Sequence, residues 1–413
     1  MTAITCCRSC GSHSLATVLD LGLQPIANAL VDPSNASVTE ERFPLKLAFC
    51  HACTLVQVTE TIPPEILFGR DYPYFSSVSA ALLAHSREHV EALMATNRLG
   101  PDSLVVEVAS NDGYLLRNFV ELGIPVLGVD PAAGPAADAE ACGVPTRVAF
   151  FDAETARSIV GDAGQADIIL ANNVLAHVEG INSFVEGFKI LLKPDGIAQF
   201  EFPYLKELVE LCAFDTIYHE HVFYYSLTAL VPLFGRHGLR LIDAEPIAIH
   251  GGSLRLTVGR TGAETQRLRD LLAAEAAAGM DKYGYYADFG NRVSALREQL
   301  RTLVADLTAS GARMCAYGAA AKGATLLNYV GLEPGQLDYV VDRNPHKIGK
   351  LMPGVGLPIR PVQSLTEDRP DYLLLLAWNF GAEIMQQQRS FAESGGRFVI
   401  PVPVPQVVAS VAQ

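Results

Sequence analysis

Two short cysteine pairs near the start of the chain constrain its fold more than any other feature. Cys7 and Cys10 form one Cys-x-x-Cys pair, and Cys50 and Cys53 form the other. The two-residue spacing lets neighbouring sulfurs converge on one ion, so the four thiolates can close a tetrahedral shell around zinc. Because such a shell leaves no position for water, we predict one structural zinc ion per chain. The long segment between the pairs predicts a module with strands of its own.

Two alternatives remain for these cysteines, namely a pair of disulfides or a redox-active dithiol. A reducing compartment disfavours both of them. The sequence begins with no signal-peptide pattern, so we expect a cytoplasmic protein in which the zinc site persists.

Composition narrows the classes of partner. A chain of 413 residues predicts two or three domains, and its 49% of apolar residues supplies well-buried cores. No apolar run reaches the roughly 18 residues that a membrane-spanning helix needs, so we expect no membrane contact. The net charge of -14 argues against nucleic acid, because nucleic-acid phosphates require a basic surface. We therefore expect a small molecule as the partner. The sequence leaves the oligomeric state open, and we take the chain as a monomer.

The predicted fold class is α/β with three domains. These are a small zinc-binding module at 1–71, a doubly wound Rossmann-like domain at 72–250 and a second Rossmann-like α/β domain at 251–413. Apolar runs alternate with helical segments in the manner of βαβ units. Strands are expected at 104–108, 126–129, 147–150, 167–171 and 196–202, and then at 313–317, 337–341, 372–377 and 397–401. Helices are expected at 80–96 and across 265–308 with an interruption near 279–284, and a turn is expected at 192–196.

The first strand of the middle domain leads into a turn that contains Ser110, Asn111 and Gly113. Small side chains there let a ligand approach the backbone at the carboxyl edge of a parallel sheet. Asp130 ends the next strand, where a carboxylate can bind both hydroxyls of a ribose. Glu107 lies just before the turn, where it would repel a pyrophosphate and attract the cationic amino-acid end of S-adenosylmethionine. We therefore predict S-adenosylmethionine as the cofactor, with NAD as the alternative. The other residues predicted to line this site are Pro131, Phe151 and Asn172.

Residues 215–225 gather two histidines, a glutamate and three tyrosines in one short run. Imidazole titrates near neutrality, so His219 or His221 could remove a proton from a carbon beside a ketone. Tyr218 or a neutral histidine could then donate a hydrogen bond to the enolate oxygen. An HxH metal site and a polar network in an aromatic core stay open as alternatives. Further candidates for this pocket are His177, after the fourth strand, and Tyr72 and Tyr74, at the hinge from the zinc module.

A second small-residue turn, at 318–324, follows a strand and opens a helix. Backbone amides and a helix N-terminus favour an anion, and Lys322 adds a positive charge. Lys347 brings another cation to the end of the next strand, and Asn379 offers an amide at the third. We therefore predict that this edge holds a diphosphate. The tight turn of His250 to Ser253 lies between the two α/β domains.

Four motifs occur in a fixed order along the chain. They are the double Cys-x-x-Cys, the segment Glu107–Gly113, the run Tyr218–His221 and the turn Gly318–Gly323. In this order they resemble the motifs of the three-domain sugar C-methyltransferases, and the resemblance covers essentially the whole chain. It implies methylation at C-3 of a dTDP-linked 4-keto deoxysugar by S-adenosylmethionine, in deoxysugar and antibiotic biosynthesis. It also implies a structural zinc ion on the four cysteines and a nucleotide-sugar between the middle and C-terminal domains.

The same resemblance implies roles for individual residues. His221 is implied as the base that removes the C-3 proton, and Tyr218, Glu220, His177 and Tyr72 are implied to line its pocket. The candidates for binding the nucleotide-sugar are Tyr74, Ser76, His250, Ser253, Gly318, Lys322, Lys347 and Asn379. Ala320 stands where the family often has proline, which leaves the second turn less constrained.

Two functions from other classes remain as alternatives. One is an NAD-dependent nucleotide-sugar oxidoreductase that uses the second α/β unit. The other is a zinc-bearing sensor of nucleotide-sugars without catalysis, in which the run Tyr218–His221 belongs to the core.

Overall fold

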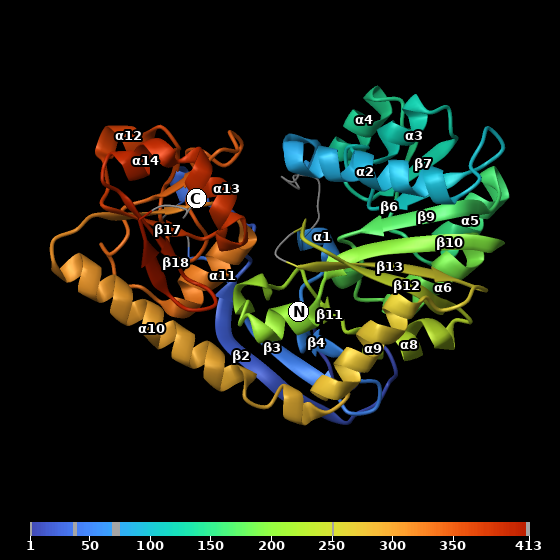
Figure 1. Cartoon of the computed structure of the whole chain (residues 1–413), viewed down its shortest axis with the longest axis horizontal. Helices are drawn as coiled ribbons and strands as arrows, with labels where there is room; N and C mark the ends of the chain where they lie inside the picture. The colour runs from blue at the N-terminus through green and yellow to red at the C-terminus, as the bar shows by residue number, and fades with distance from the viewer. Residues whose placement is uncertain (1, 36–38, 68–74, 250–251, 410–413) are drawn as a thin grey trace.

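The computed structural model describes residues 2–35, 39–67, 75–249 and 252–409. Figure 1 shows a curved antiparallel sheet from the N-terminal part of the chain, with one α/β unit on each side of it. None of the described helices is both long enough and apolar enough to cross a membrane.

The N-terminal sheet is antiparallel and has the strand order β11-β4-β3-β2. Its strands are β2 (Leu15–Pro25), β3 (Arg42–Cys50), β4 (Val56–Val58) and β11 (Phe223–Tyr224). The short strands β1 (Thr2–Ala3) and β5 (Glu60–Thr61) pair separately. The predicted strand-bearing module is therefore present. Its edge strand β11, however, comes from the middle of the sequence, directly after the candidate base.

The middle unit is a seven-stranded sheet with the order β12-β13-β10-β9-β6-β7-β8. Strands β8, β7, β6, β9 and β10 are parallel, and β13 runs antiparallel to both of its neighbours. The strands are β6 (Val105–Val108), β7 (Val126–Asp130), β8 (Thr146–Val148), β9 (Ala166–Asn172), β10 (Leu192–Pro203), β12 (Arg240–Ile247) and β13 (Ser253–Gly259). The topological switch point lies between β6 and β9, where doubly wound sheets bind their ligands.

Helices cover both faces of this sheet. They are α2 (Ala80–Thr96), α3 (Leu116–Glu121), α4 (Ala133–Ala141), α5 (Ala153–Ala163), α6 (Ile181–Leu191), α7 (Leu205–Glu210), α8 (Leu227–Arg236) and α9 (Gln266–Ala278). Helix α2 has the predicted bounds, and the Ser79 side chain caps it by accepting a hydrogen bond from the Leu82 amide. The single-turn elements near the site are η2 (Ser76–Val78), η3 (Leu175–His177) and η4 (Phe214–Thr216).

Two details of the middle unit differ from the sequence predictions. Strand β13 lies between β10 and β12, so the predicted domain boundary at 250–251 cuts through this sheet. The predicted turn at 192–196 is wrong, because these residues begin β10. Pro194 and Gly196 produce instead a register shift between Leu192 and Ile197.

The C-terminal unit is a six-stranded sheet with the order β16-β15-β14-β17-β18-β19, parallel except for β19. Its strands are β14 (Met314–Tyr317), β15 (Val340–Asp342), β16 (Ile359–Pro361), β17 (Tyr372–Leu375), β18 (Arg397–Ile400) and β19 (Gln406–Val408). Its helical elements are α11 (Ala321–Val330), α12 (Ser364–Asp368), η7 (Trp378–Phe380), α13 (Gly381–Gln387) and α14 (Arg389–Glu393). The second Rossmann-like unit is thus confirmed.

Two long helices connect the α/β units, as the sequence predicts. Helix α9 ends at Gly279, whose φ of 78° is left-handed and lets the last turn close. Helix α10 (Phe289–Ala309) then runs along the C-terminal unit (Figure 1).

Candidate functional site

The four predicted cysteines converge at one end of the N-terminal sheet. Their Sγ atoms lie within 4.8 Å of one another, and both the Cys7–Cys53 and the Cys10–Cys50 pairs are 3.6 Å apart. A disulfide requires about 2.05 Å, so these distances exclude that alternative. A tetrahedral zinc ion with bonds of about 2.3 Å holds its sulfurs about 3.8 Å apart, which fits the observed spacing. The donor set is therefore that of a structural zinc site.

The turn after β6 has an unusual backbone. Ala109, Asn111 and Gly113 have φ angles of 59°, 49° and 72°. Asp130, at the end of β7, stabilises this turn, because its two carboxylate oxygens accept hydrogen bonds from the amides of Asn111 (2.9 Å) and Ala132 (2.8 Å). The Asp130 carboxylate thus shapes the cofactor turn, a role that the sequence did not predict, and it retains lone pairs for a ribose.

Several buried polar groups at the switch point have no hydrogen-bond partner in the part of the chain that the structure describes. They are both carboxylate oxygens of Glu107, the hydroxyl of Ser110 and the amide oxygen of Asn172. Burial, together with the charge of Asp130, raises the pKa of Glu107 well above its usual range. A buried carboxyl without a donor is costly unless a ligand supplies one. The cationic amino group of S-adenosylmethionine fits this place.

Two other predicted cofactor residues have different surroundings. The ring of Phe151 packs edge-on against Phe184 (5.6 Å between centroids) and Phe188 (5.1 Å), within the hydrophobic core. It is 7% exposed, which leaves mainly its backbone for a ligand. Pro131 is half-buried beside Asp130.

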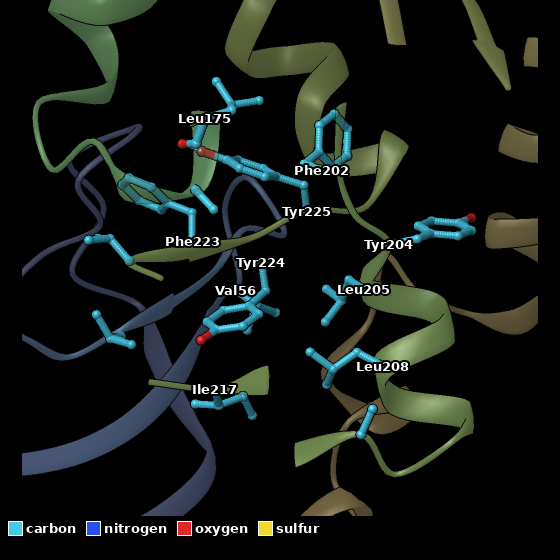
Figure 2. Close-up of a cluster of buried hydrophobic side chains, with 14 of the residues drawn as sticks. Val56, Leu175, Phe202, Tyr204, Leu205, Leu208, Ile217, Phe223, Tyr224 and Tyr225 are labelled. Carbon is cyan, nitrogen blue, oxygen red and sulfur yellow. Dashed lines mark hydrogen bonds between the residues drawn. The ribbon is translucent and has the colours of Figure 1, made fainter. Parts of the chain in front are cut away.

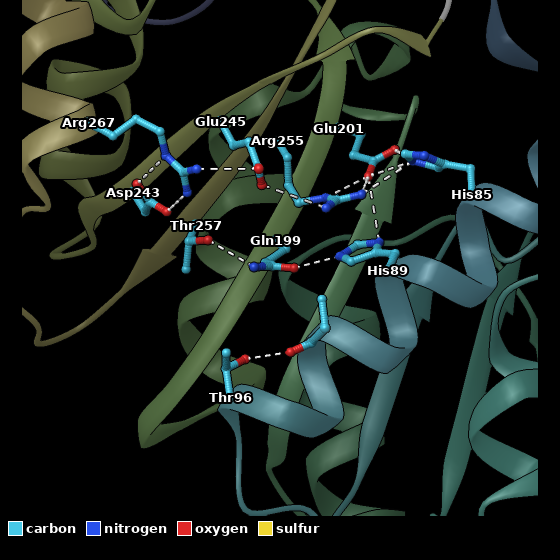
Figure 3. A network of polar contacts seen from close by, with 11 residues as sticks. His85, His89, Thr96, Gln199, Glu201, Asp243, Glu245, Arg255, Thr257 and Arg267 are labelled. Carbon is cyan, nitrogen blue, oxygen red and sulfur yellow. Dashed lines mark hydrogen bonds and ion pairs between the residues drawn. The ribbon is translucent and has the colours of Figure 1, made fainter.

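A charged network that the sequence did not predict fastens α2 to the sheet (Figure 3). The Glu201 carboxylate of β10 lies 2.9 Å from His85 Nε2 and accepts a hydrogen bond from Arg255 Nε at 2.8 Å. Burial alone would raise the pKa of Glu201, but the His85 hydrogen bond and the Arg255 charge hold it at about 2. The Glu201 carbonyl in turn accepts the Asn173 amide at 2.7 Å, next to the cofactor turn. These partners are distant in sequence and carry no motif.

The run 215–225 brings two of its predicted residues, Tyr218 and His221, together and places them beside His177. His221 Nδ1 lies 3.0 Å from the Thr216 carbonyl oxygen, which can only accept, so Nδ1 carries the proton. The Tyr218 hydroxyl lies 2.9 Å from Nε2 and donates to it. The His177 ring meets the His221 ring edge-on, with 4.8 Å between centroids, and its burial lowers the pKa of His177 to about 4. His221 Nε2 is thus a basic nitrogen beside a hydroxyl donor.

The neighbours of His221 face the N-terminal module instead. His219 Nε2 donates to the Pro44 carbonyl at 3.2 Å, and burial lowers the pKa of His219. The Glu220 carboxyl accepts hydrogen bonds from Asn28 Nδ2 at 2.8 and 3.0 Å. Burial raises the pKa of Glu220 to about 7. The arrangement separates the two histidines that the sequence left as equal candidates.

At the second switch point the predicted cations contact other protein groups. Lys322 Nζ donates to Asn379 Oδ1 at 3.0 Å and lies 3.7 Å from the Asp215 carboxylate of the middle unit. The same ammonium lies 4.0 Å from the centre of the Trp378 ring. Lys347 Nζ donates to the Ala319 carbonyl at 2.7 Å. A phosphate would therefore have to compete with these groups for both cations.

The remaining substrate candidates are placed as follows. The Ser76 amide donates to the Asn111 side chain at 2.9 Å, so η2 lies on the cofactor turn. Ser253 is buried in β13, where its hydroxyl donates to the Ile249 carbonyl at 3.2 Å. Gly318 has a φ of 99°, and a Cβ there would lie 3.0 Å from Ala377. Tyr72, Tyr74 and His250 lie outside the described residues.

Three family models match along the chain: a zinc binding domain at 7–68, a methyltransferase domain at 83–244 and a C-methyltransferase C-terminal domain at 248–403. C-methyltransferase NovU of Streptomyces niveus is 36% identical over 407 residues, which cover 98% of this chain and 97% of that protein. A ubiquinone biosynthesis O-methyltransferase of Rhodopseudomonas palustris is 27% identical over 93 residues, or 22% of this chain and 37% of that protein.

Among solved structures, magnesium protoporphyrin IX methyltransferase (ChlM) of Synechocystis PCC 6803 matches 43% of this chain and 79% of its own, with 15% identity and a TM-score of 0.34.

Proposed function

Because the chain belongs to the C-methyltransferase family with an N-terminal zinc-binding domain, we propose that it methylates C-3 of a dTDP-linked 4-keto deoxysugar. The methyltransferase domain implies S-adenosylmethionine as the cofactor, and this cofactor supplies a methyl group that is open to attack by carbon. The pairing of His221 with Tyr218, at the edge of the middle sheet, is the observation that carries the proposal. It offers a base and a hydroxyl donor within one hydrogen bond of each other.

In the proposed reaction, the 4-keto group acidifies the C-3 hydrogen and His221 Nε2 removes it as a proton. The Thr216 carbonyl, which accepts from Nδ1, stabilises the imidazolium that forms. The Tyr218 hydroxyl then turns from His221 to the enolate oxygen, because Nε2 no longer accepts a hydrogen bond once it is protonated. The C-3 carbanion would supply the electron pair of the new carbon–carbon bond to the methyl group of the cofactor, and the methyl–sulfur bond would break with its electron pair left on sulfur, so that a neutral thioether would leave.

Glu107 and Asp130 are proposed to hold the amino group and the ribose of the cofactor. The nucleotide-sugar is proposed to bind at the edge of the C-terminal sheet, through Gly318, Lys322, Lys347 and Asn379. Holding both ligands in fixed positions converts methyl transfer into an effectively intramolecular step. We further propose that the chain acts as a monomer.

The substitution His221→Asn tests the base. Asparagine keeps much of the shape and removes the titratable nitrogen, so turnover should fall by on the order of 10²–10⁴ while both ligands still bind. Exchange of the C-3 hydrogen with heavy water, which needs the base but no methyl transfer, should disappear and can be followed by NMR spectroscopy of the sugar nucleotide.

His219→Asn is the matched control, because His219 contacts Pro44 rather than the pocket. It should retain most of the exchange, because the Asn28–Glu220 contact and the β11–β4 pairing still attach the run to the N-terminal module. If exchange survives in His221→Asn, the base lies elsewhere, and a loss in His219→Asn alone would assign it to His219.

A further inference from the structure

The run that carries His221 is attached to the N-terminal module on both sides of this residue. Before it, His219 donates to Pro44 and Glu220 accepts from Asn28. After it, Phe223 and Tyr224 pair with β4 as strand β11 of the N-terminal sheet. Figure 2 shows Val56 of β4 beside Tyr224, its partner in the strand pairing, within one apolar cluster. The candidate base is therefore positioned by the module that carries the zinc site.

One buried residue of β4 contacts both the cysteine cluster and this run. Gln57 is fully buried, and its Nε2 donates to Cys7 Sγ at 3.1 Å. Its Oε1 accepts the Arg8 amide at 3.1 Å, inside the first cysteine pair. Its backbone pairs with Phe223, two residues beyond His221. The side chain of Gln57 thus contacts the first cysteine pair, while its main chain pairs with the strand that follows His221.

Main-chain hydrogen bonds also connect strand β4 to the element that carries His177. The Val58 amide donates to the Val222 carbonyl at 2.9 Å, and the Val222 amide donates to the Ala176 carbonyl at 2.7 Å. Ala176 precedes His177 in η3, and η3 is fastened further by Tyr225, whose hydroxyl donates to the Leu175 carbonyl (2.9 Å; Figure 2). A displacement of β4 would therefore move His221 and His177 together.

We propose that Gln57 is a positioning residue that couples the zinc shell to the catalytic run, so that zinc sets the geometry of the base without taking part in the chemistry. The primary amide suits this task, because it donates to a thiolate at one end and accepts a backbone amide at the other. The inference rests on the proposed function only in the role that it gives to His221.

The test is Gln57→Leu in the full-length zinc-loaded protein. Leucine fills the site but removes the donor to Cys7 and the acceptor for Arg8. The affinity for zinc, measured by competition with a chelator, should fall 10–100-fold, which is the usual effect of losing an outer-shell hydrogen bond, and zinc release should become faster. Hydrogen–deuterium exchange of the peptide 218–225 should accelerate by on the order of tenfold, while exchange of β6–β10 and the affinity for S-adenosylmethionine stay within about twofold.

Gln24→Leu is the matched control. Gln24 is also a buried glutamine of this module, but its Nε2 donates to the Leu21 carbonyl, away from β4 and the cysteines. This variant should leave the exchange of 218–225 and the release of zinc unchanged. Equal effects of both substitutions, or an unchanged 218–225 peptide in Gln57→Leu, would overturn the proposal.

Chelation of zinc from the wild-type protein gives a second measurement if Gln57→Leu does not fold. The peptide 218–225 should lose protection before β6–β10 does, and simultaneous loss would contradict the coupling. None of these measurements needs a sugar substrate. A failure of His221 as the base would appear in the C-3 exchange experiment instead, so the two proposals can fail separately.

Discussion

The two α/β units share more than a strand order. Counted from its own first strand, each sheet has the core order 3-2-1-4-5, and in each an aspartate ends the second strand. The Asp130 carboxylate accepts hydrogen bonds from the main-chain amides of Asn111 and Ala132. The Asp342 carboxylate likewise accepts hydrogen bonds from the amides of Ala319 (2.7 Å) and Asn344 (2.8 Å). An equivalent carboxylate therefore stabilises the equivalent turn in each unit.

The units differ in how their switch points satisfy polar groups. In the middle unit, Glu107, Ser110 and Asn172 leave buried atoms without partners among the described residues. In the C-terminal unit, Lys322 and Lys347 are bonded to protein groups. A common topology thus yields one edge with unsatisfied carboxylate, hydroxyl and amide oxygens and another whose two lysines are hydrogen-bonded to protein groups. The unsatisfied oxygens at the edge of the middle sheet support the proposal that the cofactor binds there.

The largest expected effect concerns the two equivalent aspartates. Asp130→Ala should weaken S-adenosylmethionine binding by about 10–100-fold, because the cofactor turn loses two hydrogen bonds and the ribose loses a charged acceptor, together about 1.5–3 kcal/mol. Asp342→Ala should leave this affinity within about twofold and weaken binding of dTDP instead. Isothermal titration calorimetry with both ligands measures this, and equal losses in the two variants would erase the distinction between the units.

An intermediate effect is expected from Glu107. Burial raises the pKa of Glu107 and so favours the protonated carboxyl in the free protein, whereas a bound ammonium group favours the ionised form. Binding of S-adenosylmethionine should therefore release protons, at most one per site, and the affinity should rise with pH below the pKa of the free group. Calorimetry in buffers of different ionisation enthalpy counts the proton. Glu107→Gln should release none, and proton uptake by the wild type would contradict the assignment.

The smallest expected effect concerns the edge of the C-terminal sheet, where the Asp215 carboxylate lies beside the Lys322 ammonium. Asp215→Asn keeps an acceptor for the Trp378 indole, which donates to Asp215 at 2.7 Å, but removes the charge beside Lys322. The ammonium should then be more available to a phosphate, and the affinity for dTDP should rise by about threefold. Lys322→Met should lower it. Calorimetry that finds weaker binding in Asp215→Asn would mean that the Asp215–Lys322 pair is itself part of the binding site.

Local patterns predicted much of this fold. Helix α2 and the break at Gly279 follow from apolar periodicity and a glycine cap, and both lie where the sequence places them. Most parallel strands of the two sheets follow from buried apolar runs, but the parallel strand β16 was not predicted. Strand β11 could not be assigned to its sheet, because its partner β4 is distant in the chain and two residues carry no pairing pattern. Strand β13 was not predicted either, although it follows its partner β12 directly in the chain.

The candidate site was predictable in kind but not in detail. The chemistry of their side chains identified His221 and Glu107 as candidate site residues, and the Cys-x-x-Cys spacing identified the metal ligands. The sequence did not identify Asn28, Gln57 or Glu201, because the role of a buried amide or carboxylate is clear only when its hydrogen-bond partner is known. The compensation of Lys322 by Asp215 likewise depends on two units meeting in space.

The position of β13 limits how such chains can be recombined. A chimera joined at residue 250 would separate β13 from the sheet that it completes, leaving β10 and β12 without their shared neighbour. Helix α9 belongs with this sheet too, since its buried Glu275 accepts the Leu227 amide and the Tyr204 hydroxyl, both at 2.8 Å. The segment 279–288, between α9 and α10, is the junction at which a C-terminal unit from a relative could be exchanged with both sheets intact.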